Sequence, residues 1–312
     1  MKTVQKLNKF NNFAVIILTT NFLELFMNLF YNHTKNILIY CSLFLFTLGR
    51  TQEFAPLTTS NESDKKGSFY IYWGWNRSLY TNSDISFKGP NYDFTLEKVA
   101  AADRPSPLST EVYLNPGNFT IPQYNFRVGY FLNESYSISL GADHMKYVMK
   151  DYQQIKINGT ISNSGTIYDG NYSNTDLNLT PQFLKFEHTD GLNYFNVELR
   201  RHHQLFQRNK IAINLSEGAG GGIIVPRTNT TLLGNPRYDQ FHLAGYGLAA
   251  VAAVNVTYKR FFLQTEIKGG FIDLPSIRTT MFTEDNAKQN FWFFQSNIVL
   301  GALIGPFTCG KK

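Results

Sequence analysis

The chain has 312 residues and a formal net charge of +6, with 15% aromatic and only 17% charged residues. It is more aromatic and less charged than an ordinary soluble domain, yet its mean hydropathy of -0.23 is unlike that of a helical membrane protein. The positive charges are scattered, with no basic cluster beyond Arg200–Arg201 and no nucleic-acid motif, so we expect no nucleic-acid partner.

Residues 1–52 predict a signal peptide region. Their second apolar stretch, Ile37–Leu48, is short and follows basic residues, as the apolar part of a signal peptide does. An alternative start at Met27 gives a signal of the usual length. A pair of membrane-spanning helices is the other interpretation, and the polar residues between the two apolar stretches argue against it. Residues 53–66 are then a flexible N-terminal segment, and residues 67–307 are the exported domain.

Apolar and polar residues alternate through most of the exported domain. In Arg260–Phe271, Leu263 and Ile267 fall on one parity, and Glu266 and Lys268 fall on the other. A soluble strand usually has about 5–6 residues, whereas a strand crossing a bilayer in a closed barrel needs roughly 9–11 and shows this repeat. In chain order, the expected strands are Ser68–Asn76, Pro122–Leu132, Ser135–Met149, Pro181–Arg201, Lys210–Ser216, Phe241–Val256, Arg260–Phe271 and Phe291–Ile304.

Polar stretches rich in Gly, Pro, Asn and Thr separate these strands. Short turns are expected on the periplasmic side at Asn133-Glu134, His202–Gln207 and Thr257-Tyr258. Long outer loops are expected at Ser78–Ile121, Lys150–Leu179, Gly218–Asp239 and Asp273–Asn290. Within the first of these loops, Ser83–Lys88 and Tyr92–Glu97 predict a hairpin that prolongs the barrel wall.

The alternation changes phase within Pro181–Arg201. Leu184 and Phe186 are outward on even numbers, but Phe195 and Val197 are outward on odd ones, which indicates a bulge or a turn. Asp190-Gly191 is a local hairpin signal. Barrel topology favours one bulged strand, because a hairpin would break the succession of short and long connections. The sequence therefore predicts an all-β fold, a closed antiparallel transmembrane β-barrel of about eight strands, with ten strands as the alternative.

Nine charged residues fall on the inward parity. The lumen of an eight-stranded barrel is just wide enough for side chains to fill, and the alternating signs predict a polar plug of salt bridges. An ion path is the alternative. The nine residues are Arg127, Asp143, Lys185, Glu187, Glu198, Arg200, Lys210, Glu266 and Lys268.

One cluster suggests catalysis. His188, Asp190 and Glu198 are similar in spacing to the wall of lipid A deacylases, in which a His and a Ser lie two residues apart on one strand face. His188 has the lipid-facing parity, but Asp190 stands where this resemblance implies the serine nucleophile. A lipid hydrolase is therefore an alternative. Gly218–Gly222 predicts a flexible loop entrance or bulge, and we expect no metal site or cofactor.

By overall pattern, residues 67–305 resemble small bacterial outer-membrane barrels of the OmpA, OmpX and OmpW kind, or an uncharacterised Bacteroidetes-type barrel family. The resemblance implies a place in the bacterial outer membrane, with its lipid and the barrel assembly machinery as partners. We expect a non-enzymatic barrel whose long surface loops are structural, adhesive or ligand-contacting. A second alternative is the passage of small hydrophobic molecules through a lateral opening beside the inward residues Gly245, Gly247, Ala249 and Ala253.

Overall fold

A computed structural model describes residues 65–106, 110–113, 122–236 and 240–305, without the side chains of residues 110, 113 and 190. The chain divides into two compact units, Met1–Ala55 and Pro56–Lys312. The first unit lies outside the described residues, and so do the predicted signal peptide and the alternative start at Met27. All described strands belong to the second unit.

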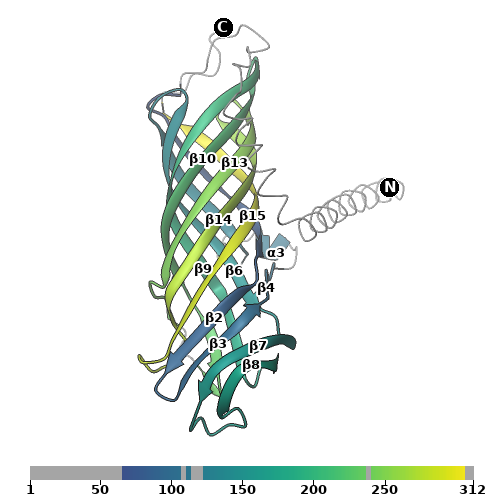
Figure 1. The fold of residues 1–312 in the computed structure, drawn as a ribbon. Helices are drawn as coiled ribbons and strands as arrows, with labels where there is room; N and C mark the ends of the chain where they lie inside the picture. The colour runs from purple at the N-terminus through teal and green to yellow at the C-terminus, as the bar shows by residue number, and fades with distance from the viewer. Residues whose placement is uncertain (1–64, 107–109, 114–121, 237–239, 306–312) are drawn as a thin grey trace, which may run out of the picture. The chain divides into compact units, whose positions relative to one another are not determined.

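Eight antiparallel strands form a closed ring (Figure 1). They are hydrogen-bonded in the order β1-β5-β6-β9-β10-β13-β14-β15, and the pairing of β1 with β15 closes the ring. The prediction of a closed eight-stranded barrel is confirmed, and the alternative of ten ring strands was wrong. The ring strands are β1 (Phe69–Tyr80), β5 (Tyr124–Phe131), β6 (Tyr136–Met149), β9 (Leu184–Arg208), β10 (Ile211–Pro226), β13 (Gly245–Tyr258), β14 (Phe261–Arg278) and β15 (Asn286–Ile304).

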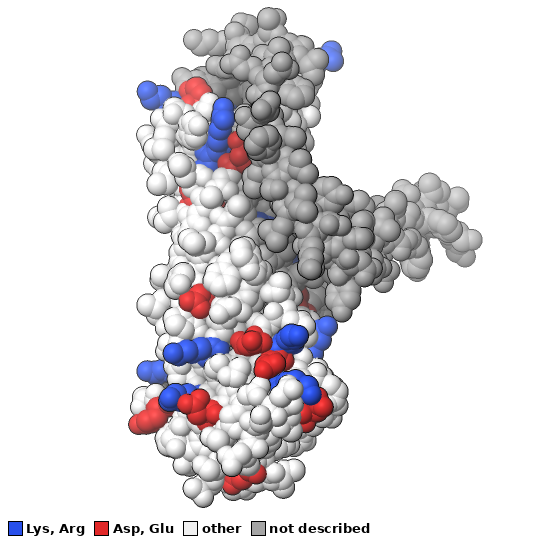
Figure 2. Space-filling view, in the orientation of Figure 1, with Lys and Arg blue, Asp and Glu red and all other residues white. Residues whose placement is uncertain are grey.

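The two-residue repeat sorts ring side chains between the lumen and the exterior. In β14, Leu263 and Ile267 are 50% and 53% exposed, whereas Gln264, Glu266 and Lys268 are 5%, 3% and 1% exposed. On the face shown in Figure 2, charged side chains gather toward both ends, and a mostly white band separates them. A water-soluble sandwich would instead bury its apolar faces against each other.

Strand β9 is a single strand of 25 residues with a bulge. Its register with β6 shifts between the pairs Met145↔Leu192 and Tyr147↔His188, so β9 has extra residues there. Gly191 lies in this bulge with φ 124°, a backbone conformation that favours glycine. The bulged strand that topology favoured is therefore present, and the hairpin at Asp190-Gly191 was wrong.

Short connections gather at one end of the ring, which we call the turn end. They join β5 to β6, β9 to β10 and β13 to β14. The predicted turn at His202–Gln207 was wrong, because β9 continues to Arg208. The turn lies at Asn209-Lys210, where Asn209 has φ 54°, as primed hairpin turns require.

At the other end, the wall continues as an extension of four strands. The start of β15 pairs with β2 (Ser83–Gly89), and β3 (Tyr92–Val99), β7 (Gln153–Ile161) and β8 (Gly170–Leu179) follow in order. In Figure 1 these strands lie at the bottom of the ribbon. The hairpin predicted at Ser83–Lys88 and Tyr92–Glu97 is present as β2 and β3.

All four predicted outer loops contain strand residues. Ser78–Ile121 contains β2 and β3, and Asp273–Asn290 contains the end of β14 and the start of β15. Lys150–Leu179 forms the hairpin of β7 and β8, so its prediction as a loop was wrong. The prediction for Gly218–Asp239 was also wrong, because β10 runs to Pro226, and Gly218–Gly222 pairs with both β9 and β13. The remaining short elements are β4 (Ala101–Ala102), α3 (Thr110–Tyr113), β11 (Asn229–Leu232) and β12 (Asn235–Pro236). Among the described residues, no helix has the length and hydropathy to span a membrane.

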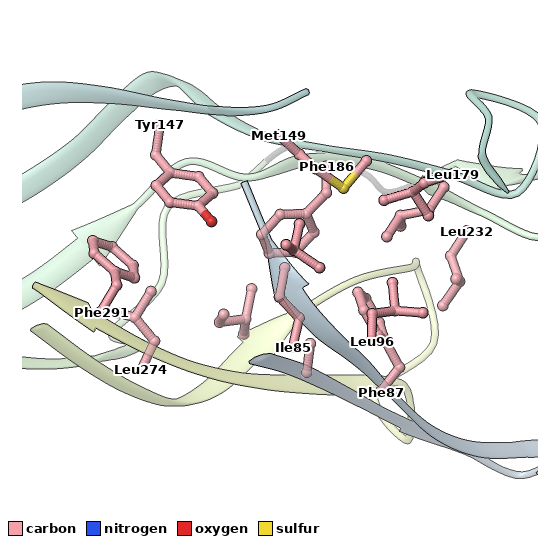
Figure 3. Packing of buried hydrophobic residues seen from close by; sticks show 14 of the residues in the cluster. Ile85, Phe87, Leu96, Tyr147, Met149, Leu179, Phe186, Leu232, Leu274 and Phe291 are labelled. Atoms are coloured by element: carbon pink, nitrogen blue, oxygen red, sulfur yellow. The ribbon is translucent and has the colours of Figure 1, made fainter. Parts of the chain in front are cut away.

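A large apolar core fills the interior at the extension end. Figure 3 shows side chains from different strands, among them Leu96, Phe186 and Phe291, lying in one shared apolar interior. Leu184 and Phe186 are 0% and 1% exposed, so their predicted outward orientation was wrong. In this part of β9 the inward face is apolar, because the wall encloses an oily interior here.

Candidate functional site

Six charged side chains meet in the lumen of the ring. None is more than 3% exposed, and three cations face three anions. We call this group the ion cluster. It consists of Arg127 on β5, Asp143 on β6, Glu198 and Arg200 on β9, and Glu266 and Lys268 on β14.

Glu198 is the most connected member of the ion cluster. Its Oε1 lies 2.8 Å from Arg127 Nη2 and 2.9 Å from Lys268 Nζ. Its Oε2 lies 2.5 Å from Arg200 Nη2. One carboxylate thus contacts three cations, which keeps each of them beside an anion in a place without bulk water.

Two further acids complete the balance of charge. Arg200 Nη1 lies 2.7 Å from Glu266 Oε2, and Lys268 Nζ lies 2.5 Å from Asp143 Oδ2. The Tyr72 hydroxyl accepts a hydrogen bond of 2.9 Å from Arg127 Nε. Because each charge has an opposite partner, the large cost of burying it is offset within the lumen.

Small residues on the wall make room for these long side chains. A Cβ on Gly141 would lie 2.4 Å from Arg127 Nη2, and one on Gly220 would lie 2.6 Å from Glu198 Cγ. Both contacts are far closer than van der Waals distance. Gly141 of β6 and Gly220 of β10 therefore leave the space that the charged side chains fill.

Three residues expected in the same group lie elsewhere. Lys185 and Glu187 belong to the part of β9 before the bulge, where Glu187 pairs with Arg104 at 2.9 Å and with Lys185 at 3.5 Å. Lys210 is exposed in the turn between β9 and β10. The inward placement of Lys185 and Lys210 was wrong, since Lys185 is about half-exposed and Lys210 lies in a turn, where parity has no meaning. The bulge adds two residues, so even-numbered residues of β9 point inward on both sides of it, whereas the prediction assumed a change of phase. Glu187 is 3% exposed, but its ion partners lie outside the ion cluster.

The residues considered for lipid hydrolysis are not brought together. His188 is fully buried rather than lipid-facing, and its Nδ1 lies 2.9 Å from Thr228 Oγ1. Glu198 belongs to the ion cluster, and the side chain of Asp190 lies outside the described residues. Among the described residues, no group of three or more His, Cys, Asp or Glu is placed to hold a metal ion.

The small residues of β13 do not border an opening. Strands β10 and β13 pair continuously from Ile211↔Tyr258 to Ile224↔Gly245. Beside Gly247 the lumen is occupied by Tyr194, whose hydroxyl donates to the Gly247 carbonyl oxygen at 3.1 Å. The described wall therefore shows no lateral gap at this place.

At the turn end, Lys65 enters the lumen and is 8% exposed. Its Nζ donates to Asn214 Oδ1 at 3.0 Å, and Glu134 accepts from the Lys65 backbone N–H at 2.8 Å. The free space beside Lys65, Arg200 and His202 is ≈ 30 Å³, room for about two water molecules. Sequence reasoning missed Lys65, because no periodicity precedes β1 and the segment is simply polar.

A closed wall with apolar side chains outside and paired charges inside satisfies every requirement of a strand structure in hydrocarbon. These features define the chain as a small transmembrane β-barrel of the kind found in bacterial outer membranes.

No family model and no curated protein matches the chain. Among solved structures, it is similar to the outer membrane protein OprG from Pseudomonas aeruginosa, at 9% identity over 77% of this chain and 98% of that one, with a TM-score of 0.35. It is also similar to Ail, the attachment invasion locus protein of Yersinia pestis, at 9% identity over 75% and 99%, with a TM-score of 0.27. The outer membrane protease OmpT from Escherichia coli matches at 10% identity over 79% and 100%, with a TM-score of 0.29.

Proposed function

We propose that this chain is a non-conducting, non-enzymatic outer-membrane barrel that holds its extension outside the cell for contact with ligands or surfaces. Short turns of such barrels face the periplasm and the longer connections face outward. In this orientation the extension is the part that meets the environment. The observation that carries the proposal is the filled interior, with the ion cluster in the ring and the apolar core beyond it.

The filled lumen argues against conduction. A water-filled path would have to pass the ion cluster, whose members contact one another from β5, β6, β9 and β14. It would then have to pass apolar side chains such as Phe87, Phe186 and Phe291, each 2% exposed or less. We expect the protein reconstituted in a planar bilayer to show no steady conductance, and steady channels would replace the proposal with a pore.

The extension has the chemistry of a contact surface. The β7–β8 hairpin is rich in Asn, Ser, Thr, Gly and Tyr, the residues that binding loops use for adaptable hydrogen bonds and rigid aromatic contacts. Tyr152, just before β7, is 66% exposed, and Ile167, in the connection between β7 and β8, is 92% exposed. Large side chains held in water at these positions gain nothing for the fold, which supports a role in contact.

The test is binding by vesicles that carry the protein, measured on arrays of purified glycans and matrix proteins. We expect Tyr152→Ser with Ile167→Ser to reduce binding by at least about tenfold, the loss of roughly 1.4 kcal/mol. A matched control is Met281→Ser with Phe282→Ser, which removes exposed apolar groups, 66% and 63% exposed, from the connection between β14 and β15. Equal binding by all three proteins, or none by the wild type, would contradict the contact role.

A further inference from the structure

Four cations lie side by side at the turn end. Arg208 is the last residue of β9, Lys210 belongs to the β9–β10 turn, and Lys259 and Arg260 belong to the β13–β14 turn; all four are exposed. The turns are neighbours, since the Lys259 backbone N–H donates to the Lys210 carbonyl oxygen at 2.9 Å. We call these four residues the basic turns.

In the described part of the chain, no carboxylate forms an ion pair with the basic turns. The acids Glu134 and Glu217 at this end have other partners. Glu134 accepts from the backbone of Lys65 and Lys66, and Glu217 lies 2.7 Å from His203 Nε2. Like charges on adjoining strands destabilise each other. The arrangement therefore becomes favourable when anions from outside neutralise it.

The position of the basic turns relative to the apolar surface identifies the source of these anions. Tyr258 and Phe261, which flank Lys259-Arg260, are 53% and 69% exposed. Lys259 Nζ lies 5.4 Å from the centroid of the Tyr258 ring. Exposed aromatic rings at strand ends sit at the level of lipid headgroups, so cations beside them lie at the level of the phosphates.

The backbone of Lys259 provides a way to change the charge without adding strain to the turn. Its φ is 56°, a left-handed conformation that Gly and Asn adopt with less strain. The equivalent position of the neighbouring turn holds Asn209, with φ 54°. A lysine in such a place has a local cost, which Lys259→Asn would relieve.

We propose that the basic turns bind anionic phospholipid headgroups of the leaflet at the turn end of the barrel. The ligand is a phosphodiester headgroup with a net negative charge, held by Lys210, Lys259 and Arg260 beside the aromatic rings. This proposal does not depend on the contact role of the extension.

The test compares folding in vesicles of phosphatidylcholine with folding in vesicles in which part of that lipid is replaced by phosphatidylglycerol. The measured quantity is the gain in the folding equilibrium constant that the anionic lipid gives, obtained from urea titrations. At about 1 kcal/mol per cation near the surface, each removed charge should reduce this gain roughly fivefold. For Lys210→Gln, Lys259→Gln and Arg260→Gln together, we expect a reduction of roughly a hundredfold, which high salt should abolish.

The matched control removes three exposed cations from the extension end, Lys98→Gln, Lys150→Gln and Lys288→Gln, and should keep the gain. Lys259→Asn removes the positive charge and also lowers the backbone strain of the turn, because Asn adopts a left-handed conformation more readily than Lys. It should stabilise the protein in phosphatidylcholine yet reduce the gain from phosphatidylglycerol. The proposal is overturned if the triple variant keeps the gain from phosphatidylglycerol, or if the control variant loses that gain equally.

Discussion

The ring and the extension obey opposite rules, although continuous strands build both. In the ring, Ile298 and Leu300 of β15 are 54% and 56% exposed, while Asn297 is 2% exposed. Nearer the extension, the same strand places Lys288 outward and buries Ala287 to 1% exposure. The alternation is the same, but the medium outside changes from hydrocarbon to water. Parity therefore predicts which residues share a face of a strand, and the medium on each side determines which face is apolar.

The largest expected effect concerns the ion cluster. Glu198→Gln removes one carboxylate from contact with Arg127, Arg200 and Lys268 and leaves an uncompensated buried charge. We expect a loss of about 3–5 kcal/mol in the free energy of unfolding, measured by denaturant titration in vesicles. The same chemical change at the half-exposed Glu217 should cost less than about 1 kcal/mol. Similar losses at the two positions would show that the lumen is hydrated.

The next effect concerns the apolar core of the extension. Leu96 is 0% exposed, so Leu96→Ala should cost about 3 kcal/mol, felt mainly by the extension. Hydrogen exchange should accelerate in β2, β3 and β7 and stay slow in the ring pairs of β1 and β15. Ile167→Ala, at 92% exposure, serves as the control and should change neither. Uniform acceleration throughout the ring would mean that the two regions unfold as one unit.

A third experiment places the same charge on the two exteriors. Val197 is 45% exposed on the ring, and Val197→Arg should cost about 2–4 kcal/mol in a bilayer. Asn178→Arg on the exposed face of β8 should stay within about 0.5 kcal/mol. Unfolding in vesicles measures both variants. If Val197→Arg left the free energy of unfolding nearly unchanged, that part of the wall would be in contact with water and not with lipid.

The smallest effect concerns a surface ion pair of the extension. Lys156 Nζ lies 2.7 Å from Asp176 Oδ1, but the two side chains are 38% and 77% exposed. We expect Asp176→Asn to cost less than about 1 kcal/mol and to have no measurable effect at high salt. A larger and salt-resistant loss would show that the hairpin of β7 and β8 is covered in the native protein.

The sequence was sufficient for the ring, because each ring strand meets lipid on one side and the lumen on the other. Parity alone places Glu266 and Lys268 inside, where the structure has them. The apparent change of phase between Phe186 and Phe195 marks a change in which face of β9 is apolar, because even-numbered residues point inward on both sides of the bulge.

The extension was harder to predict for a physical reason. Leu184 and Phe186 look outward if oily residues always meet lipid, yet both belong to the internal core. His188 lies two residues after Phe186 on β9, has the same inward orientation and is also buried. The strands of Lys150–Leu179 were read as a loop, since their outward Asn, Ser and Thr residues resemble loop composition. Lys65 precedes the first strand, and only the fold brings Asn214 to it.

A spin-label scan along the outward and inward positions of β15, in a chain with Cys41 and Cys309 replaced by Ser, would show where the wall meets lipid, water and the lumen. Relaxation by oxygen and by a water-soluble nickel complex reports whether each label meets lipid, water or protein. We predict lipid at Ile298 and Leu300, water at Lys288 and Asn290, and neither at Gln295 and Asn297. Access of the nickel complex to Gln295 and Asn297, or to Ile298 and Leu300, would contradict a plugged barrel that crosses the bilayer at this level.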